Sequence, residues 1–333
     1  MKDPGAQVVE HLRAAFEPGR PWCEDEPAGF SWWPHVVRQR VQAEPARADD
    51  AVRGHAETGL VRGVQGTGER FALLARQAAA DPGLSTLRWN GETGEVSLRA
   101  AVIARPMDWA GAARRLAHAA LLQVGDAARL APALARGLGG EVASPREGAG
   151  TRGEPDALVE AWRPYAERGA KESPLLGEPM TRALAMDPKP WRNVTGSSRG
   201  LDAELPCAAP GETPGVPAVG LLRLVASQPH PRLGSGLLAV LQPPVDTEPD
   251  PQRVFATAAL LNEGESREWV DADQLGGWCV HPSQGLVYAS FVPALACDDG
   301  VLERQAWQMA QRARWARAFL RSTARARQAN SVC

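Results

Sequence analysis

The chain has 333 residues, enough for two domains that each bury a hydrophobic core without metals or disulfides. Its 37 basic and 39 acidic residues leave a formal charge of −2, so no global field attracts the protein to nucleic acid or to an anionic membrane. The five cysteines are widely spaced, which predicts neither a disulfide framework nor a zinc site. No apolar run approaches the ~18 residues of a membrane span, so we expect a cytoplasmic protein.

The first half of the chain predicts one α+β unit. Hydrophobic periodicity gives elements in the order α-β-β-α-β-β-α. In chain order they cover Val8–Phe16, Gly29–Ala43, Val52–Val64, Glu69–Ala80, Leu84–Trp89, Glu95–Ala104 and a long helix that begins at Met107. The glycines of the third element predict a bulge or bend in that strand.

The second half predicts a similar unit with longer connections. Residues 141–155 contain three glycines and two prolines and few large apolar side chains, which is typical of a linker. We therefore expect a first domain over 1–140, a linker over 141–155, a second domain over 156–325 and a tail over 326–333. The expected elements of the second domain are helices over Asp156–Glu167, Gln252–Asn262 and Gly300–Leu320, and strands over Trp191–Leu205, Val219–Ala226, Ser235–Leu241, Gly277–Val280 and Leu286–Ala294.

The two halves also match in register. When the turn glycines Gly94 and Gly285 are aligned, Leu87 falls on Trp278, so that apolar side chains meet on the same strand face. The prediction is an α+β fold made of two tandem copies of an α-β-β-(β)-α-β-β-α unit. Each antiparallel sheet is expected to pack against helices, and the two copies would form a pseudo-dimer within one chain.

The chain has 11 tryptophans and two tyrosines. An aromatic platform for a partner is one interpretation, and core packing is the other. Core packing is favoured for the tryptophans on the repeated strands and helices, which are Trp89, Trp109, Trp278, Trp307 and Trp315. Trp32 and Trp33 differ, because adjacent residues of a strand point to opposite faces and one of them should leave the core side. Burial of that ring at a domain or subunit contact is favoured, and an open interaction surface is the alternative. Together with Phe30, Trp32 and Trp33 form the first candidate partner-binding surface.

A second candidate surface is the C-terminal helix, whose arginines include Arg312, Arg317 and Arg321. These side chains could contact an acidic partner or nucleic acid. Cations near the end of a helix are also explained by the helix dipole alone. No nucleic-acid partner is expected on the near-neutral overall charge.

No catalytic or metal-binding signature is present. His55 and Glu57 supply two ligands at most, because the remaining histidines are scattered. The glycine-rich stretch Gly63–Gly68 lacks the lysine of a phosphate-binding loop, and no GxSxG motif presents a nucleophilic serine. We therefore expect no catalytic residue, no metal and no cofactor.

The order of elements resembles the type III secretion chaperone-like fold. The chain is similar to a tandem member of the family that joins these bacterial chaperones with the YbjN-like proteins, often named TY-Chap. The segments that carry the resemblance are Gly29–Ala43, His55–Thr58, Leu87–Ala104, Trp109–Ala110 and Ala119–Val124, with a second copy over 156–320. The resemblance implies a non-enzymatic peptide-binding or adaptor role, with sheets that pair as dimers and hold an extended segment of a client.

The leading hypothesis is a cytoplasmic chaperone-like adaptor that binds a protein or peptide client through sheet faces, strand edges and the Trp32/Trp33 region. Two alternatives stay open: an enzyme with an unrecognised cleft, and a small-ligand sensor with a cleft between the two domains. An enzyme should gather perturbed ionisable groups in one concave site, whereas an adaptor should show an apolar patch or an open edge. Homo-oligomerisation also stays open.

Overall fold

The structure is a computed structural model of the chain. It describes residues 3–19, 21–35, 37–44, 50–65, 68–80, 82–143, 152, 154, 156–158, 173–187, 189–207, 219–244, 250–268 and 270–330. The chain divides into two compact units, Met1–Arg168 with Asp273–Gly277, and Gly169–Ala272 with Trp278–Cys333. No helix among the described residues is long and apolar enough to cross a membrane.

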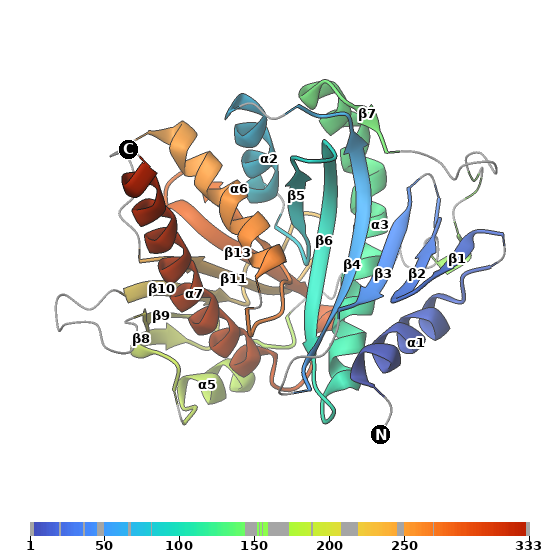
Figure 1. The fold of residues 1–333 in the computed structure, drawn as a ribbon. Helices are drawn as coiled ribbons and strands as arrows, with labels where there is room; N and C mark the ends of the chain where they lie inside the picture. Colours follow the sequence, from blue (N-terminus) through green and yellow to red (C-terminus); the bar gives the residue numbers. More distant parts are fainter. Residues whose placement is uncertain are drawn as a thin grey trace. The chain divides into compact units, whose positions relative to one another are not determined.

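The first unit is an antiparallel sheet with helices packed on it (Figure 1). Its elements are α1 (Pro4–Phe16), β1 (Cys23–Glu26), β2 (Gly29–Trp32), β3 (Gln39–Ala43), β4 (Val52–Arg62), α2 (Gly68–Ala80), β5 (Thr86–Asn90), β6 (Glu95–Ala104), α3 (Trp109–Leu138) and β7 (Glu141–Val142). The strand order is β1-β2-β3-β4-β6-β5, and β7 pairs with β4. The bulge expected in the third element is found in β4, where the register shifts between Gly59 and Val61.

Helices α1 and α3 cover one face of this sheet. Helix α1 begins where Asp3 accepts a hydrogen bond from the backbone N–H of Ala6 at 3.0 Å. Its buried side chains Val8, Leu12 and Phe16 recur every four residues and therefore form one apolar stripe. A second apolar cluster joins α2, α3 and the strands β4 to β6; it includes Leu60, Val61, Leu74, Leu87, Val96, Leu98, Leu130, Leu134 and Leu138.

The second unit is also an antiparallel sheet with helices packed on it (Figure 1). Its elements are α5 (Glu178–Leu184), β8 (Arg192–Ser197), β9 (Gly200–Pro206), β10 (Val219–Val225), β11 (Gly236–Gln242), α6 (Pro251–Arg267), β12 (Gly277–His281), β13 (Gly285–Pro293), the 3-10 turn η1 (Ala294–Ala296) and α7 (Val301–Asn330). The strand order β8-β9-β10-β11-β13-β12 follows the same topology as the order in the first sheet. The α+β class with two antiparallel sheets is thus confirmed.

The turn glycines of the two hairpins share a backbone conformation. Gly94 and Gly285 both adopt the left-handed backbone, with φ of 68° and 71°, which glycine enters at no steric cost. Leu87 and Trp278, which the alignment places together, are both buried. Trp89, expected in the core, is half-buried and packs against the edge of the apolar cluster. Trp307, also expected in the core, is 40% exposed, so that prediction is wrong.

Several strands are shorter than expected. The single strand predicted over Gly29–Ala43 is the pair β2 and β3, because the chain turns at Trp33-Pro34 and proline cannot donate to a ladder. The strand predicted over Trp191–Leu205 is the hairpin β8–β9, which turns at Ser198-Arg199. Strand β1 was not predicted. Most of the expected linker and most of the helix over Asp156–Glu167 lie outside the described residues.

One short segment joins the first unit from far along the sequence. Gln274 forms a two-way antiparallel bridge with Ala101 of β6, with N···O distances of 3.1 and 2.8 Å. The neighbouring Asp273 accepts hydrogen bonds from the backbone N–H of Ile103 at 2.9 Å and from Arg115 at 2.8 Å. Residues 273–277 therefore extend the first sheet beyond the end of β5.

The unequal burial of Trp89 and Trp278 gives a stability prediction. We expect Trp278→Ala to destabilise the protein by about 3–5 kcal/mol, because a fully buried aromatic ring is removed. Trp89→Ala should cost less, because part of its ring already contacts water. Chemical denaturation followed by far-UV circular dichroism measures both losses. An equal or larger loss for Trp89→Ala would contradict the burial that the structure assigns.

Candidate partner-binding surface

The first candidate surface from the sequence lies in the core. Phe30 and Trp32 are two residues apart on β2 and both point toward α1, where they contact Phe16 at ring-centroid distances of 6.5 and 5.1 Å. The indole N–H of Trp32 donates to Gln39 at 2.9 Å, and Gln39 in turn donates to Thr58 at 2.9 Å. These side chains are therefore structural, and a partner cannot reach them in this conformation.

One of Trp32 and Trp33 was expected to leave the core side, to an open face or to a domain or subunit contact, and the structure buries both rings within the first unit. Strand β2 ends at Trp32, so strand alternation does not apply to the next residue. Trp33 is only 5% exposed. The guanidinium of Arg38 lies 5.5 Å from its ring centroid, and Arg152 donates to its carbonyl oxygen at 3.0 Å. Arg38 therefore packs over a ring that the strand pattern alone would leave outside.

The second candidate surface is also largely internal. Arg312 is 1% exposed and donates to Glu265, which is fully buried, at 2.8 Å. Its guanidinium lies 3.8 Å from the ring centroid of Tyr288. Arg317 is buried and donates to the carbonyl oxygen of Cys207 at 3.0 Å. Of the three arginines predicted to bind a partner, only Arg321 is exposed.

The face of the first sheet opposite α1 and α3 carries a cluster of ionisable groups. Glu44 lies 3.1 Å from Arg99 and 3.9 Å from Arg53, and it is 3.8 Å from Nδ1 of His55. Arg99 also approaches Glu57 at 3.6 Å. Burial, with the neighbouring arginines, holds the pKa of His55 well below its usual range, so the imidazole is neutral at pH 7.

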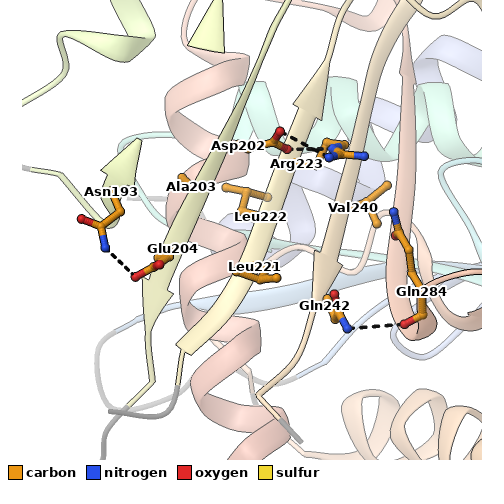
Figure 2. A pocket seen from close by; sticks show the side chains of 10 residues that line it. All are labelled: Asn193, Asp202, Ala203, Glu204, Leu221, Leu222, Arg223, Val240, Gln242 and Gln284. Atoms are coloured by element: carbon orange, nitrogen blue, oxygen red, sulfur yellow. Dashed lines mark hydrogen bonds and ion pairs between the residues drawn. The ribbon is translucent and has the colours of Figure 1, made fainter. Parts of the chain in front are cut away.

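The outward face of the second sheet holds a shallow pocket of about 340 Å³ (Figure 2). It lies on the side of β9, β10 and β11 that is directed away from their buried side chains. The residues that line it are Asn193, Asp202, Ala203, Glu204, Leu221, Leu222, Arg223, Val240, Gln242 and Gln284. A second hollow of about 290 Å³ adjoins it and shares Asp202 and Arg223.

The charged groups of this face are paired with one another, as Figure 2 shows for Asp202 with Arg223. Arg223 donates to both carboxylate oxygens of Asp202, at 2.7 and 3.3 Å, and this contact raises the pKa of Arg223. Glu204 accepts from Arg192 at 3.2 Å and from Asn193 at 2.9 Å through the same oxygen. The face is therefore close to neutral, and its ion pairs are solvent-exposed and individually weak.

Apolar side chains occupy much of the same face. Strand alternation places Leu221 and Val225 of β10 and Leu238 and Val240 of β11 on the outward side, and all four are partly or largely exposed. Leu221 lines the pocket, is 51% exposed and lies between Glu204 of β9 and Gln242 of β11. An uncovered face of an antiparallel sheet normally alternates to polar residues, so an apolar outward face indicates a surface that another molecule covers.

Sequence reasoning missed this surface, although a signal was present. Strand β10 reads Val-Gly-Leu-Leu-Arg-Leu-Val, with large apolar residues at both odd and even positions. A strand with one wet face needs apolar residues in one phase only. Leu221 is the outward leucine of β10, where a polar residue would be expected.

His55 and Glu57 are not joined by further metal ligands. In the described part of the chain, no three His, Cys, Asp or Glu side chains lie close enough together to hold a metal ion. The expectations of no metal and no cofactor stay predictions. Comparisons with models of known protein families, with curated proteins and with solved structures found no match.

The lowered pKa of His55 predicts an acid-side loss of stability. In the unfolded chain this histidine titrates near pH 6.5, whereas in the folded protein it stays neutral to a lower pH. The unfolded state therefore binds more protons below about pH 6.5, and the free energy of unfolding falls as the pH falls through that value. Below the pKa of His55 in the folded protein, both states bind this proton, and His55 no longer makes the free energy of unfolding depend on pH.

His55→Gln removes the titration, so we expect a shallower pH dependence below about pH 6.5, by up to about 1.4 kcal/mol per pH unit. Denaturation curves at a series of pH values measure the slope. His281→Gln, at an exposed turn, controls for the removal of one histidine. Equal flattening in the control would contradict the assignment to His55.

The buried pair Arg312–Glu265 gives a second stability prediction. Arg312→Ala should cost about 3–5 kcal/mol, because it leaves the Glu265 carboxylate buried with the indole N–H of Trp278 but without its cation. The double variant Arg312→Met/Glu265→Gln removes both charges and should recover most of the loss. Urea denaturation measures both, with the exposed Arg321→Ala as control. A near-neutral Arg312→Ala would show that the pair is not buried in solution.

Proposed function

We propose that this protein is a non-enzymatic, cytoplasmic, chaperone-like adaptor that binds a protein client on the outward face of β9, β10 and β11. The observation that carries the proposal is the 51% exposed Leu221, which lines the pocket, with partly exposed Val240, Leu238 and Val225 farther along the same outward face. Burying these side chains against a partner removes apolar area from water, at roughly 25 cal/mol per Å². A client thus has a physical reason to bind at this face.

The proposed architecture behind this role is two tandem copies of one α+β unit. It is supported by the common strand order of the two sheets and by the matching left-handed glycines Gly94 and Gly285. The same features support the resemblance to the type III secretion chaperone-like and YbjN-like family. The proposal assigns client binding to the second unit, because its outward sheet face carries the exposed apolar residues.

The chemistry of the pocket favours binding over catalysis. Asp202 and Glu204 each accept a hydrogen bond from an arginine, and the contact with Asp202 raises the pKa of Arg223 further from neutrality. A catalytic acid or base needs a pKa near the working pH. The side chains of this face can instead anchor an apolar segment and orient it with amides and paired charges.

Site-specific photo-crosslinking tests the proposal. A benzophenone amino acid that replaces Leu221 should crosslink a discrete protein in cells, because its ring lies on the binding face. The same probe in place of Trp307, an exposed aromatic on α7 of the same unit, is the matched control. Mass spectrometry of the crosslinked band identifies the client.

The identified client then allows a quantitative test. Leu221→Arg should weaken client binding by about 2 kcal/mol or more, as at an interface hot spot, with an unchanged melting temperature. Trp307→Arg should leave the affinity unchanged. A probe that crosslinks at position 307 but not at 221, or a folded Leu221→Arg protein with full affinity, would refute this location of the binding face.

A further inference from the structure

The apolar side chains of the binding face lie inside the sheet and away from its edge. The full strand order β12-β13-β11-β10-β9-β8 has its edges at β12 and β8, and Leu221 belongs to β10, which is nearer to β8. Neighbouring strands are about 4.8 Å apart, so β10 lies about 10 Å from the edge. A client strand added to β8 would extend the sheet sideways and leave Leu221 uncovered.

The edge itself is poorly suited to strand addition. The register of β8 against β9 shifts between Arg192 and Thr195, and Asn193 has a left-handed φ of 50°. A bulge of this kind bends the edge and interrupts its regular row of backbone donors and acceptors. Of the usual modes of peptide recognition, addition of a strand is therefore disfavoured here.

A segment that lies on the face cannot hydrogen-bond its backbone to the sheet, because the strands of the sheet use their backbone groups in the sheet plane. An α-helix satisfies its own backbone groups and presents only side chains. Arg223, paired with Asp202, lies between Leu221 and Val225 on β10, so the apolar side chains continue from Leu221 to Val240 and Leu238 of β11. Over the four residues from Leu221 to Val225 the face extends about 13 Å, which about nine helical residues span. Apolar residues spaced i, i+3 or i+4, and i+7 would match this length.

The charges beside the apolar stripe define one flank of such a helix. Glu204 receives both of its hydrogen bonds on Oε2, and its Oε1 accepts none within the described part of the chain. Asp202, on the same strand, binds Arg223. A lysine or arginine over β9 can therefore donate to a half-exposed carboxylate oxygen, whereas an acidic side chain there would be repelled.

We propose that the client segment is an amphipathic α-helix that lies along β10 and β11, with an apolar stripe on Leu221 and Val240 and a basic residue over Glu204. This inference rests on the function proposed above and adds the form of the partner. The chemistry is that of a helix docking on an exposed sheet face, with apolar burial as the main attraction and one charge-assisted hydrogen bond that sets the orientation.

A displayed library of random 16-residue peptides tests the inference with the full-length protein. Peptides are selected on the wild type and counter-selected on Leu221→Arg. We expect the enriched sequences to carry apolar residues at i, i+3 or i+4, and i+7, with Lys or Arg on one flank, and to become helical when bound. Enrichment of alternating, strand-like peptides, or of no Leu221-dependent peptide, overturns the inference.

Fluorescence anisotropy with one enriched peptide then resolves the individual contacts. Leu221→Arg should weaken binding at least tenfold, Glu204→Gln about threefold or more, and Trp307→Arg not at all. Leu221→Ser, a milder change, keeps the test valid if the arginine variant melts early. Loss of affinity on Leu221→Ser without any effect of Glu204→Gln would refute the basic flank.

The two proposals fail separately. If the crosslink at position 221 captures a client whose bound segment is extended, the adaptor role stands and the helical form is wrong. If no protein crosslinks at position 221 but helical peptides still bind there, the face is a helix-binding surface and the adaptor role falls.

Discussion

Strand alternation is the constraint on which the rest of this structure depends. Each side chain of a β-strand points to the face opposite its neighbours, so a sheet covered by helices on one face always presents a second set of side chains on the other. In the first unit that second set is the ion-pair cluster of Glu44, Arg53, His55 and Arg99. In the second unit it is an apolar strip around Leu221 with paired charges beside it. The same topology therefore supports two very different outward faces.

The ion pairs of the protein differ in how much they contribute to stability. Arg312 and Glu265 are buried, so the loss of either partner leaves a desolvated charge and affects stability. Arg223 and Asp202 are half-exposed and contribute little to stability, yet they keep the face neutral and hold both side chains in fixed positions. A buried pair constrains the fold, whereas an exposed pair shapes a surface on which a partner can be discriminated.

The sequence was most informative where periodicity is long. The sequence predicted the two long helices, α3 and α7, and the two hairpins whose turns contain Gly94 and Gly285. Each of these elements combines a regular apolar pattern with a glycine at its end or turn. Short strands such as β1 could not, because four residues carry too little pattern. Trp33 packs against Arg38 across the turn between β2 and β3, where strand alternation no longer applies. Arg312 is buried with Glu265, which is 47 residues away, so a local pattern does not reveal that pair.

The segment at residues 273–277 has a consequence for biosynthesis. It bridges to β6 across a gap of more than 150 residues, and its Asp273 holds Arg115 of α3 at 2.8 Å. A ribosome must therefore make most of the second unit before the first unit acquires its last sheet contacts. Until then the end of β6 near Ala101 has an open edge, which is a template for unwanted pairing. The synthesis of residues 105–272 is thus an interval in which Ala101 of β6 does not yet have its bridge partner Gln274.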